Sequence, residues 1–300
     1  MAKPNDFSSV ANVPILILAG GLGTRLAEET TVKPKPMVEI GGLPILIHIM
    51  RGYYQHGFND FVICGGHKVN EIKKFFVDYQ FNIHDLELDT RTQAGGMPRA
   101  ISTGAAEERW RVRVLDTGAE TMTGGRVARA FDIISRDQKV ENFAVTYGDG
   151  LSDVDLAAEL RFHTKHKALG TVLGVKNLAR YGELDIQNEE EVTGFLEKPQ
   201  DRQGYISGGF FFFNAKFRKY LDPRTDLYLE REPLMKLASD GQLKVFKHGG
   251  FWAPMDTLRD KIHLQSLWDN GQAPWATWRN TNANDTVSDR SDRAAWRRAG

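Results

Sequence analysis

The stretch ILILAGGLGTRL, residues 15–26, joins a buried-strand pattern to a glycine-rich turn. Its first part is a continuous apolar run with β-branched members, which is typical of a strand buried in a parallel sheet. Three glycines follow within four residues, namely Gly20, Gly21 and Gly23. Such a turn lets backbone N–H groups point at phosphate oxygens without interference from Cβ atoms. The stretch therefore predicts an α/β fold with a phosphate-binding turn.

Two familiar phosphate-binding patterns fit this turn only in part. A P-loop ends in lysine followed by serine or threonine, whereas this turn continues with Thr24 and Arg25. The dinucleotide fingerprint needs a third glycine where Leu26 stands, and its acidic residue, here Glu39, would follow two prolines. A nicotinamide oxidoreductase is therefore disfavoured. A turn without ligand is the other alternative, but Arg25 favours a forked contact with phosphate.

The segment VKPKPMVEI, residues 32–40, places two lysines between prolines. Pro34 and Pro36 restrict the backbone, so the segment is expected to be stiff and extended. A lysine held rigidly near a glycine-rich turn suits a fixed cation for a polyphosphate, and Lys35 is the candidate. For Lys33, a solvated basic turn is the simpler interpretation.

The composition is that of an ordinary globular protein. The chain has 300 residues and a formal net charge of zero, which argues against nucleic-acid binding and against a polybasic membrane anchor. Its single cysteine, Cys64, excludes an internal disulfide and is expected to be a buried structural thiol. The N-terminal residues have no sustained apolar region. We therefore expect a cytoplasmic protein with no membrane or nucleic-acid partner.

The order of elements indicates a parallel sheet with crossover helices. After the first strand come a helix at 44–57, a strand at 60–66 and a helix at 70–79, which is the strand–helix alternation of α/β proteins. Further strands are expected at 111–118, 143–150, 171–175, 205–214 and 243–252, a hairpin at 182–199, and helices at 124–134, 154–166, 232–239 and 256–271. The strand at 205–214 contains GGFFFFN, whose phenylalanines are expected in the core.

Three segments fall outside this alternation. Residues 1–12 are polar and are expected to form a flexible N-terminal arm. Residues 82–110 are polar and weakly periodic, which indicates a protruding excursion and a contact in a homo-oligomer. Residues 281–300 lack apolar periodicity and are expected to be a disordered tail. The remainder, residues 13–280, is expected to form one domain.

Several stretches, taken in order, carry a family resemblance. LAGGLGTRL and KPKPMVEIGGLPIL resemble the signature of the sugar-1-phosphate nucleotidylyltransferases. Within these, EETTVKPKPMVEIGG, DTGAETMTGGRV, TYGDGLSDVD and APMDTLRDK resemble the glucose-1-phosphate cytidylyltransferases. The resemblance implies a nucleotidyltransferase fold with a Rossmann-like, mixed, mostly parallel sheet flanked by helices. It also implies that CTP and glucose 1-phosphate give CDP-glucose and pyrophosphate, for the synthesis of CDP-sugars and of cell-surface polysaccharide such as O-antigen.

The resemblance also implies a nucleotide site around the glycine-rich turn. Its residues are Leu18, Ala19, Gly20, Gly21, Leu22, Gly23, Thr24, Arg25, Lys35, Thr121, Arg126 and Gly148. Arg25, on the departing β- and γ-phosphates, and Lys35, on the α-phosphate, are the catalytic candidates, because in-line attack needs positioning and charge neutralisation. For Thr121 and Arg126, a polar loop and a helix-surface arginine are the alternative.

A Mg²⁺ site at Asp149 and Asp256 is implied as well. Asp149 ends the strand at 143–150, where ligands of parallel sheets gather, although Asp-Gly is also a common turn pair. Asp256 fits a helix N-cap equally well. The implied sugar-phosphate contacts are Gly182, Glu197, Lys198 and Gly208. For Glu197 and Lys198, an exposed hairpin end is the alternative.

Other functions remain open from the sequence. The same fold could use UTP or dTTP, because base selectivity cannot be derived from the residues. A non-catalytic subunit that binds nucleotide sugars is a second alternative, against which the retention of Arg25, Lys35, Asp149 and Asp256 speaks. The eight histidines show no metal-ligand spacing.

Overall fold

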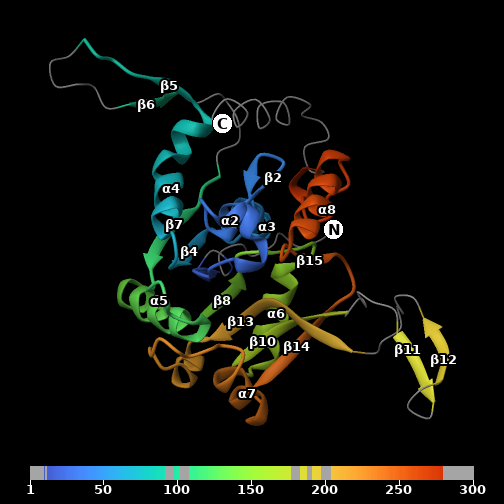
Figure 1. Ribbon diagram of the computed structural model, residues 1–300. Coiled ribbons are helices and arrows are strands. Elements are labelled where there is room, and N and C mark those ends of the chain that lie inside the picture. The colour runs from blue at the N-terminus through green and yellow to red at the C-terminus, as the bar shows by residue number, and fades with distance from the viewer. Residues whose placement is uncertain are drawn as a thin grey trace, which may run out of the picture.

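A seven-stranded sheet in the order β14-β10-β13-β8-β1-β4-β7 forms the centre of the protein (Figure 1). The computed structural model describes residues 10, 12–91, 98–101, 108–176, 183–187, 191–196 and 204–279. The strands of the sheet are β1 (Ile15–Ala19), β4 (Asp60–Gly65), β7 (Arg111–Asp116), β8 (Asn142–Tyr147), β10 (Gly170–Lys176), β13 (Tyr205–Asn214) and β14 (Leu243–His248). β1, β4, β7 and β8 run parallel, as do β10 and β14, whereas β13 is antiparallel to β8 and β10. The predicted mixed, mostly parallel sheet is confirmed.

Helices cover both faces of this sheet (Figure 1). They are α2 (Ala27–Thr30), α3 (Ile45–Tyr54), α4 (Val69–Ile83), α5 (Thr123–Asp137), α6 (Leu156–His166), α7 (Glu232–Ser239) and α8 (Leu258–Asp269). Short 3₁₀ turns are η1 (Thr24–Leu26), η2 (Lys35–Met37), η3 (Ala215–Tyr220) and η4 (Thr277–Arg279). Alternate residues of β1 enter two hydrophobic clusters, Ile15 and Ile17 with α3, α6 and α8, and Leu16 and Leu18 with α5 and α7. The sheet is therefore the middle of three layers.

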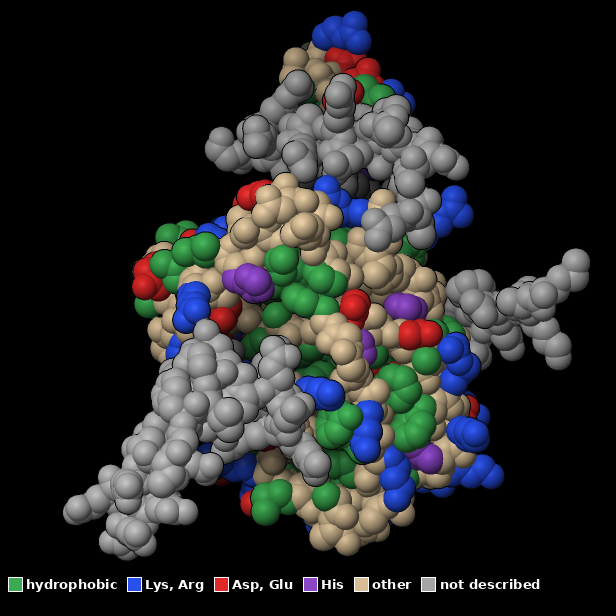
Figure 2. All heavy atoms as spheres, turned by 90° about the vertical axis from the view of Figure 1, so that its right-hand side faces the viewer, with side chains coloured by type: hydrophobic (Ala, Val, Ile, Leu, Met, Phe, Trp, Pro, Cys, Tyr) green, Lys and Arg blue, Asp and Glu red, His purple; other side chains and the backbone are tan. Residues whose placement is uncertain are grey.

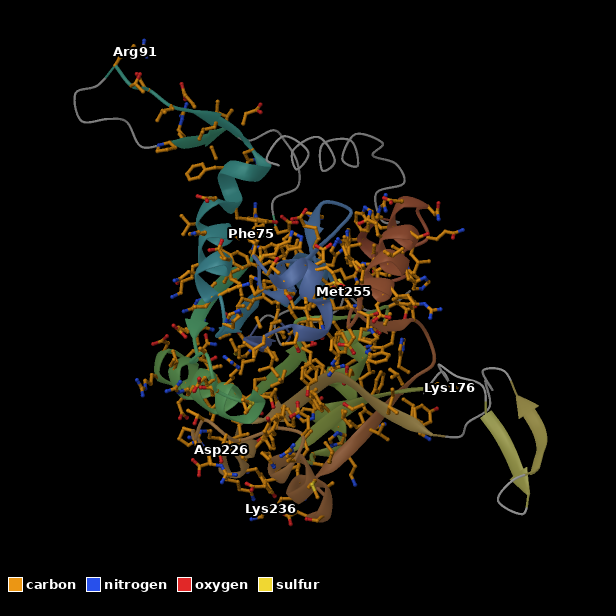
Figure 3. All side chains as sticks on the ribbon, viewed as in Figure 1. Phe75, Arg91, Lys176, Asp226, Lys236 and Met255 are labelled. Carbon is orange, nitrogen blue, oxygen red and sulfur yellow. The ribbon has the colours of Figure 1, made fainter. Side chains whose placement is uncertain are left out.

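Four two-stranded pairs lie outside the main sheet. They are β2 (Glu39–Ile40) with β3 (Leu43–Pro44), β5 (Asp85–Glu87) with β6 (Arg99–Ile101), β9 (Gly150–Ser152) with β15 (Trp252–Pro254), and β11 (Glu183–Gln187) with β12 (Glu191–Leu196). The β5–β6 pair extends away from the end of α4, and Arg91 lies near its tip (Figures 1 and 3). It occupies part of the predicted excursion at 82–110.

The expectation of one strand at 243–252 is wrong. The chain forms β14 in the main sheet and then β15, which pairs with β9 instead. Gly249 and Gly250 separate the two strands, and a Cβ on Gly250 would lie 2.5 Å from Asp153 Oδ1. This close approach lets the chain turn from one sheet to the other, so that β15 ends beside β8.

The buried parts agree with the sequence-based expectations at the phenylalanine run and at Cys64. Phe210 to Phe213 are 0–4% exposed, so the phenylalanine run is core, as predicted. Cys64 is fully buried, and burial raises the pKa of its thiol to about 12. It is therefore an inert structural thiol, as expected.

The outer surface mixes charges of both signs. On the face shown in Figure 2, Lys and Arg side chains lie among acidic, histidine and hydrophobic ones. Among the described residues, no helix combines the length and the apolar character that a bilayer crossing needs.

Candidate active site

The glycine-rich turn follows β1 at the carboxyl edge of the sheet. Gly23 has φ 67°, a left-handed conformation that favours glycine. The Thr30 hydroxyl donates hydrogen bonds to the carbonyl oxygens of Gly23 and Leu26, at 3.1 and 2.9 Å. The turn is thus fixed from inside by α2. Its outer residues, from Gly21 to Arg25, are mostly exposed and available to a ligand.

Arg126 of α5 lies beneath this turn and is only 5% exposed. Its guanidinium donates to the carbonyl oxygens of Gly20 at 3.0 Å and Gly65 at 2.9 Å, and to the Thr117 hydroxyl at 2.7 Å. A Cβ on Gly20 would lie 2.1 Å from the Arg126 guanidinium carbon. Arg126 therefore joins the turn after β1 to the turn after β4, and it is not a helix-surface arginine. Its predicted contact with nucleotide stays a prediction.

We expect Gly20→Ala to destabilise the protein by about 1–3 kcal/mol, the usual range for overpacking. The added methyl group must displace the Arg126 guanidinium and break its hydrogen bonds. The free energy of unfolding in urea measures the effect. Gly21→Ala is the matched control, because nothing lies within 4 Å of a Cβ there. Equal effects from both substitutions would show that the contact with Arg126 has no part in fixing the turn.

Lys35 starts a 3₁₀ turn rather than lying in an extended segment, so the expectation of an extended backbone is wrong at this residue. Pro34 itself is extended, with φ −70° and ψ 154°, but the Val38 N–H then donates to the Lys35 carbonyl oxygen. The turn aims Lys35 inward, where its side chain is 14% exposed. Lys33 instead pairs with Glu39 at the surface, with 2.7 Å between Nζ and Oε1. Lys33 is therefore a half-buried, ion-paired side chain rather than a freely solvated one.

Asp149 lies in the short turn between the carboxyl end of β8 and the start of β9. The neighbouring Gly148 donates its N–H to the Leu18 carbonyl oxygen at 3.0 Å. A Cβ on Gly148 would lie 2.8 Å from that oxygen and 2.9 Å from Pro36 Cγ. The backbone of Gly148 therefore packs closely between β1 and the turn that carries Lys35. This packing brings Asp149 to the glycine-rich turn.

Strand β15 brings Asp256 to the same place. It pairs with β9 so that Pro254 opposes Gly150, and the Met255 N–H donates to the Asp149 carbonyl oxygen at 2.8 Å. Met255 is fully buried and lies near the middle of the molecule (Figure 3). The antiparallel pairing therefore places two aspartates that are far apart in the sequence next to each other.

The Lys35 ammonium lies between these two carboxylates. Its Nζ is 2.5 Å from Asp149 Oδ2 and 2.8 Å from Asp256 Oδ1. Burial lowers the pKa of this ammonium, but the two carboxylates outweigh burial, so that the pKa is raised. Arg25 reaches the other oxygen of Asp256 at 3.4 Å and is itself 76% exposed. Two cations and two anions thus meet beside the glycine-rich turn.

Asp256 is not the N-cap of α8, so that alternative is wrong. Thr257 is the cap, and its hydroxyl accepts from the Asp260 N–H while the Asp260 carboxylate accepts from the Thr257 N–H. The same carboxylate also accepts from the Asp256 N–H at 3.0 Å. Asp260 was missed by the sequence analysis, although a Thr followed three residues later by an acid is a capping-box pattern. The cap leaves the Asp256 carboxylate directed to Lys35.

The remaining predicted residues lie in different surroundings. Thr121 is 3% exposed and packs beside Gly118, where its hydroxyl accepts a hydrogen bond from Arg129 at 3.5 Å. The Gly208 carbonyl oxygen accepts a hydrogen bond from the Trp252 indole N–H at 2.7 Å. Since Trp252 begins β15, Gly208 is joined to the strand that leads into Asp256. Three residues lie outside those the structure describes: Gly182, Glu197 and Lys198.

The donor set at Asp149 and Asp256 fits Mg²⁺. Both side chains supply carboxylate oxygens, the hard ligands that Mg²⁺ prefers, and one cationic group already contacts both. No cluster of three or more histidine, cysteine or acidic side chains suited to a metal occurs within the described ranges. The arrangement therefore suits a cation that completes its shell with water and substrate phosphates.

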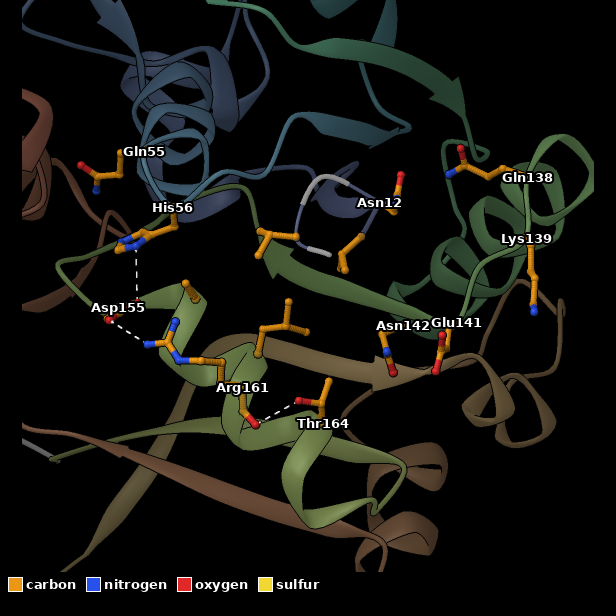
Figure 4. A pocket seen from close by; sticks show the side chains of 14 residues that line it. Asn12, Gln55, His56, Gln138, Lys139, Glu141, Asn142, Asp155, Arg161 and Thr164 are labelled. Carbon is orange, nitrogen blue, oxygen red and sulfur yellow. Dashed lines mark hydrogen bonds and ion pairs between the residues drawn. The ribbon is translucent and has the colours of Figure 1, made fainter. Parts of the chain in front are cut away.

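A separate cavity of about 960 Å³ lies at the opposite edge of the sheet (Figure 4). It is lined by residues that precede β1 and β8, such as Val13 and Glu141. At one end, Asp155 pairs with His56 at 3.5 Å and with Arg161 at 3.6 Å. None of the predicted site residues that the structure describes lines this cavity.

Comparison with known proteins agrees with this geometry. The family model described as nucleotidyl transferase matches residues 15–257. Glucose-1-phosphate cytidylyltransferase of Salmonella typhi is 46% identical over 263 residues, which cover 88% of this chain and 98% of that protein. A Bacillus subtilis protein named "Probable glucose-1-phosphate cytidylyltransferase" is 38% identical over 266 residues, 88% of this chain and 99% of that protein.

A solved structure bears on the fold alone. The crystal structure of HddC from Yersinia pseudotuberculosis has a TM-score of 0.59 and 22% identity, and the match covers 85% of this chain and 99% of that chain. The fold and the family model together define an enzyme of the nucleotidyl transferase class. Within this class, the chain belongs to the glucose-1-phosphate cytidylyltransferase family.

Proposed function

We propose that the protein transfers a cytidylyl group from CTP to α-D-glucose 1-phosphate, giving CDP-glucose and pyrophosphate. The observation that carries this proposal is the contact of Lys35 with Asp149 and Asp256 beside an exposed glycine-rich turn. The names of the relatives supply the nucleotide and the sugar. The charged side chains of the site lie where the triphosphate of CTP and the phosphate of the sugar must approach each other.

The reaction is an in-line displacement at phosphorus. A phosphate oxygen of glucose 1-phosphate forms a bond to the α-phosphorus of CTP, and the bond between that phosphorus and the bridging oxygen of pyrophosphate breaks. Backbone N–H groups of the exposed turn bind phosphate oxygens. Arg25, which is 76% exposed, extends to the departing β- and γ-phosphates. Lys35 stabilises the negative charge on the α-phosphate.

Asp149 and Asp256 hold Mg²⁺ in this proposal. When bound, the cation screens the repulsion between the two phosphate groups and neutralises developing charge. Asp149 directly precedes β9 and Asp256 lies two residues after the end of β15, so their separation is set by the β9–β15 pairing. The protein thus fixes two ligands and leaves the remaining positions to water and substrate.

Nucleoside and sugar contacts flank this centre. We assign the nucleoside to the side of Thr121 and Gly148, where Arg126 fixes the turns after β1 and β4. We assign the sugar phosphate to Gly182, Glu197, Lys198 and Gly208, with carboxylate to hydroxyls and ammonium to phosphate. The Trp252–Gly208 hydrogen bond supports the assignment of Gly208, because it joins this residue to β15, the strand that leads into Asp256.

Cellular setting and assembly complete the proposal. A cytoplasmic enzyme would feed CDP-sugar and cell-surface polysaccharide synthesis, including O-antigen. The homo-oligomer stays a prediction, supported by the exposed apolar side chains Leu86, Leu88 and Ile101 on and beside the β5–β6 pair, which are 53%, 55% and 45% exposed. Apolar side chains on a protruding arm favour contact with a second copy.

We expect pyrophosphate release with glucose 1-phosphate to be fastest with CTP at subsaturating nucleotide. The measurement compares CTP, UTP, dTTP, ATP and GTP with the same enzyme sample, using a coupled pyrophosphate assay. Comparable turnover with UTP or dTTP would overturn the cytidylyl assignment and leave the nucleotidyl transferase class intact. Binding of nucleotide sugar without pyrophosphate release from any triphosphate would instead indicate a non-catalytic subunit.

A further inference from the structure

Lys35 contacts both carboxylates to which the metal is assigned. Its Nζ lies within 2.8 Å of one oxygen from Asp149 and one from Asp256. The three side chains are 14%, 26% and 28% exposed, so the contact is largely shielded from water. In a shielded place, two carboxylates that face one point repel each other unless a cation lies between them. The Lys35 ammonium is that cation in this structure.

A metal ion held between the two aspartates competes with the ammonium for their oxygens. Mg²⁺ is held through carboxylate oxygens at about 2.0–2.1 Å, which leaves no room for an ammonium on those same lone pairs. The backbone of Lys35 is fixed by the bond from the Val38 N–H and by Pro34, whereas its four-carbon stem is flexible and its three donors rotate. The ammonium is therefore the part that can move, because the aspartates are fixed by strand pairing.

The proposed reaction offers the ammonium a second place. Once nucleotide is bound, the α-phosphate beside the glycine-rich turn presents a new anion within reach of the same stem. Moving Lys35 to that phosphate frees both carboxylates for the cation and keeps every charge paired.

We propose that Lys35 holds the metal site closed until nucleotide binds, so that nucleotide binding opens the site to the divalent cation. The inference rests on the proposed function, since it takes the carboxylates as metal ligands and the α-phosphate as the partner of Lys35. The protein without nucleotide then binds the metal weakly. Bound nucleotide raises the metal affinity by a larger factor than direct ligation of the metal by the phosphate would give. Metal and nucleotide thereby enter the site as a coupled pair.

Mn²⁺ is the probe for the metal, followed by its electron paramagnetic resonance signal without any nucleotide. Lys35→Met should bind Mn²⁺ at least about tenfold more tightly than wild type, because charged hydrogen bonds to two carboxylates need no longer be broken. Lys33→Met is the matched control. It removes the same charge two residues away, where Lys33 pairs with Glu39 instead, so it should leave Mn²⁺ affinity nearly unchanged.

CMP is the probe for the proposed effect of nucleotide on metal binding. It carries the α-phosphate and lacks the β- and γ-phosphates that chelate metals strongly. Saturating CMP should raise the Mn²⁺ affinity of wild type by a larger factor than that of Lys35→Met. Thermal melting with and without Mn²⁺ checks folding. Lys35→Met should melt lower than wild type in metal-free buffer and should gain more from Mn²⁺, since the two carboxylates then lack a cation.

Two results would overturn the inference. If Lys35→Met binds Mn²⁺ no more tightly than Lys33→Met, the ammonium does not compete with the metal. If CMP raises the Mn²⁺ affinity of wild type and of Lys35→Met by the same factor, nucleotide does not move Lys35. Asp149→Asn and Asp256→Asn separate this failure from that of the proposed function. If neither weakens Mn²⁺ binding, the metal site itself is wrong; if both do, the metal site stands whatever Lys35 does.

Discussion

Asp256→Asn is expected to slow cytidylyl transfer by at least about a hundredfold, because charge stabilisation by a bound metal is worth several kcal/mol. The substitution removes one negative charge at nearly constant shape. It also removes a partner of Lys35, whose Nζ lies 2.8 Å from Asp256 Oδ1. The measurement is kcat as a function of Mg²⁺ concentration, and the Mg²⁺ needed for half-maximal rate should rise. Asp149→Asn should likewise lower kcat and raise the Mg²⁺ concentration needed for half-maximal rate.

Asp260→Asn is the matched control for this substitution. Asp260 lies four residues away and its carboxylate serves the capping box of α8. Its replacement should lower stability by about 0.5–2 kcal/mol, the range for a lost cap, with little change in the Mg²⁺ dependence of kcat. If Asp256→Asn keeps the wild-type Mg²⁺ dependence, the two-carboxylate site is wrong.

Lys35→Ala is expected to cost on the order of 2–4 kcal/mol of transition-state stabilisation, which is about 30- to 1,000-fold in kcat. The ammonium meets charge that develops on the α-phosphate, and it contacts both aspartates. The measurement is kcat at saturating CTP and glucose 1-phosphate. Lys33→Ala should change kcat only slightly, because Lys33 pairs with Glu39 at the surface. Equal losses from the two substitutions would mean that the lysines are misassigned.

Some of the fold was predictable because local pattern and tertiary structure agree. The apolar run forms β1 (Ile15–Ala19), and the phenylalanine run forms the core of β13, since short apolar runs bounded by turn residues favour a buried strand. The interval 232–239 forms α7 with the predicted bounds. The boundary between β14 and β15 was missed, because it depends on the approach of Gly250 to Asp153, which no local pattern contains.

The site was predictable to a smaller extent. Ligands of parallel sheets gather at the carboxyl ends of the strands, which points to Asp149. Asp256 was equally compatible with a metal ligand and with a helix cap, and only the β9–β15 pairing and the cap at Thr257 separate these two interpretations. Arg126 has an ordinary helical position in the sequence. Its burial beneath Gly20 follows from the contact of α5 with β1 and β4, which sequence periodicity does not specify.

The central claim is that Asp149 and Asp256 act as one unit in nucleotidyl transfer. The most direct measurement is kcat for wild type, Asp149→Asn, Asp256→Asn and the double variant, with CTP, glucose 1-phosphate and Mg²⁺ at saturation. Groups that act together are strongly non-additive, so the double variant should be little slower than the slower single variant. Losses that multiply, so that the double variant shows the product of both effects, would contradict a shared site.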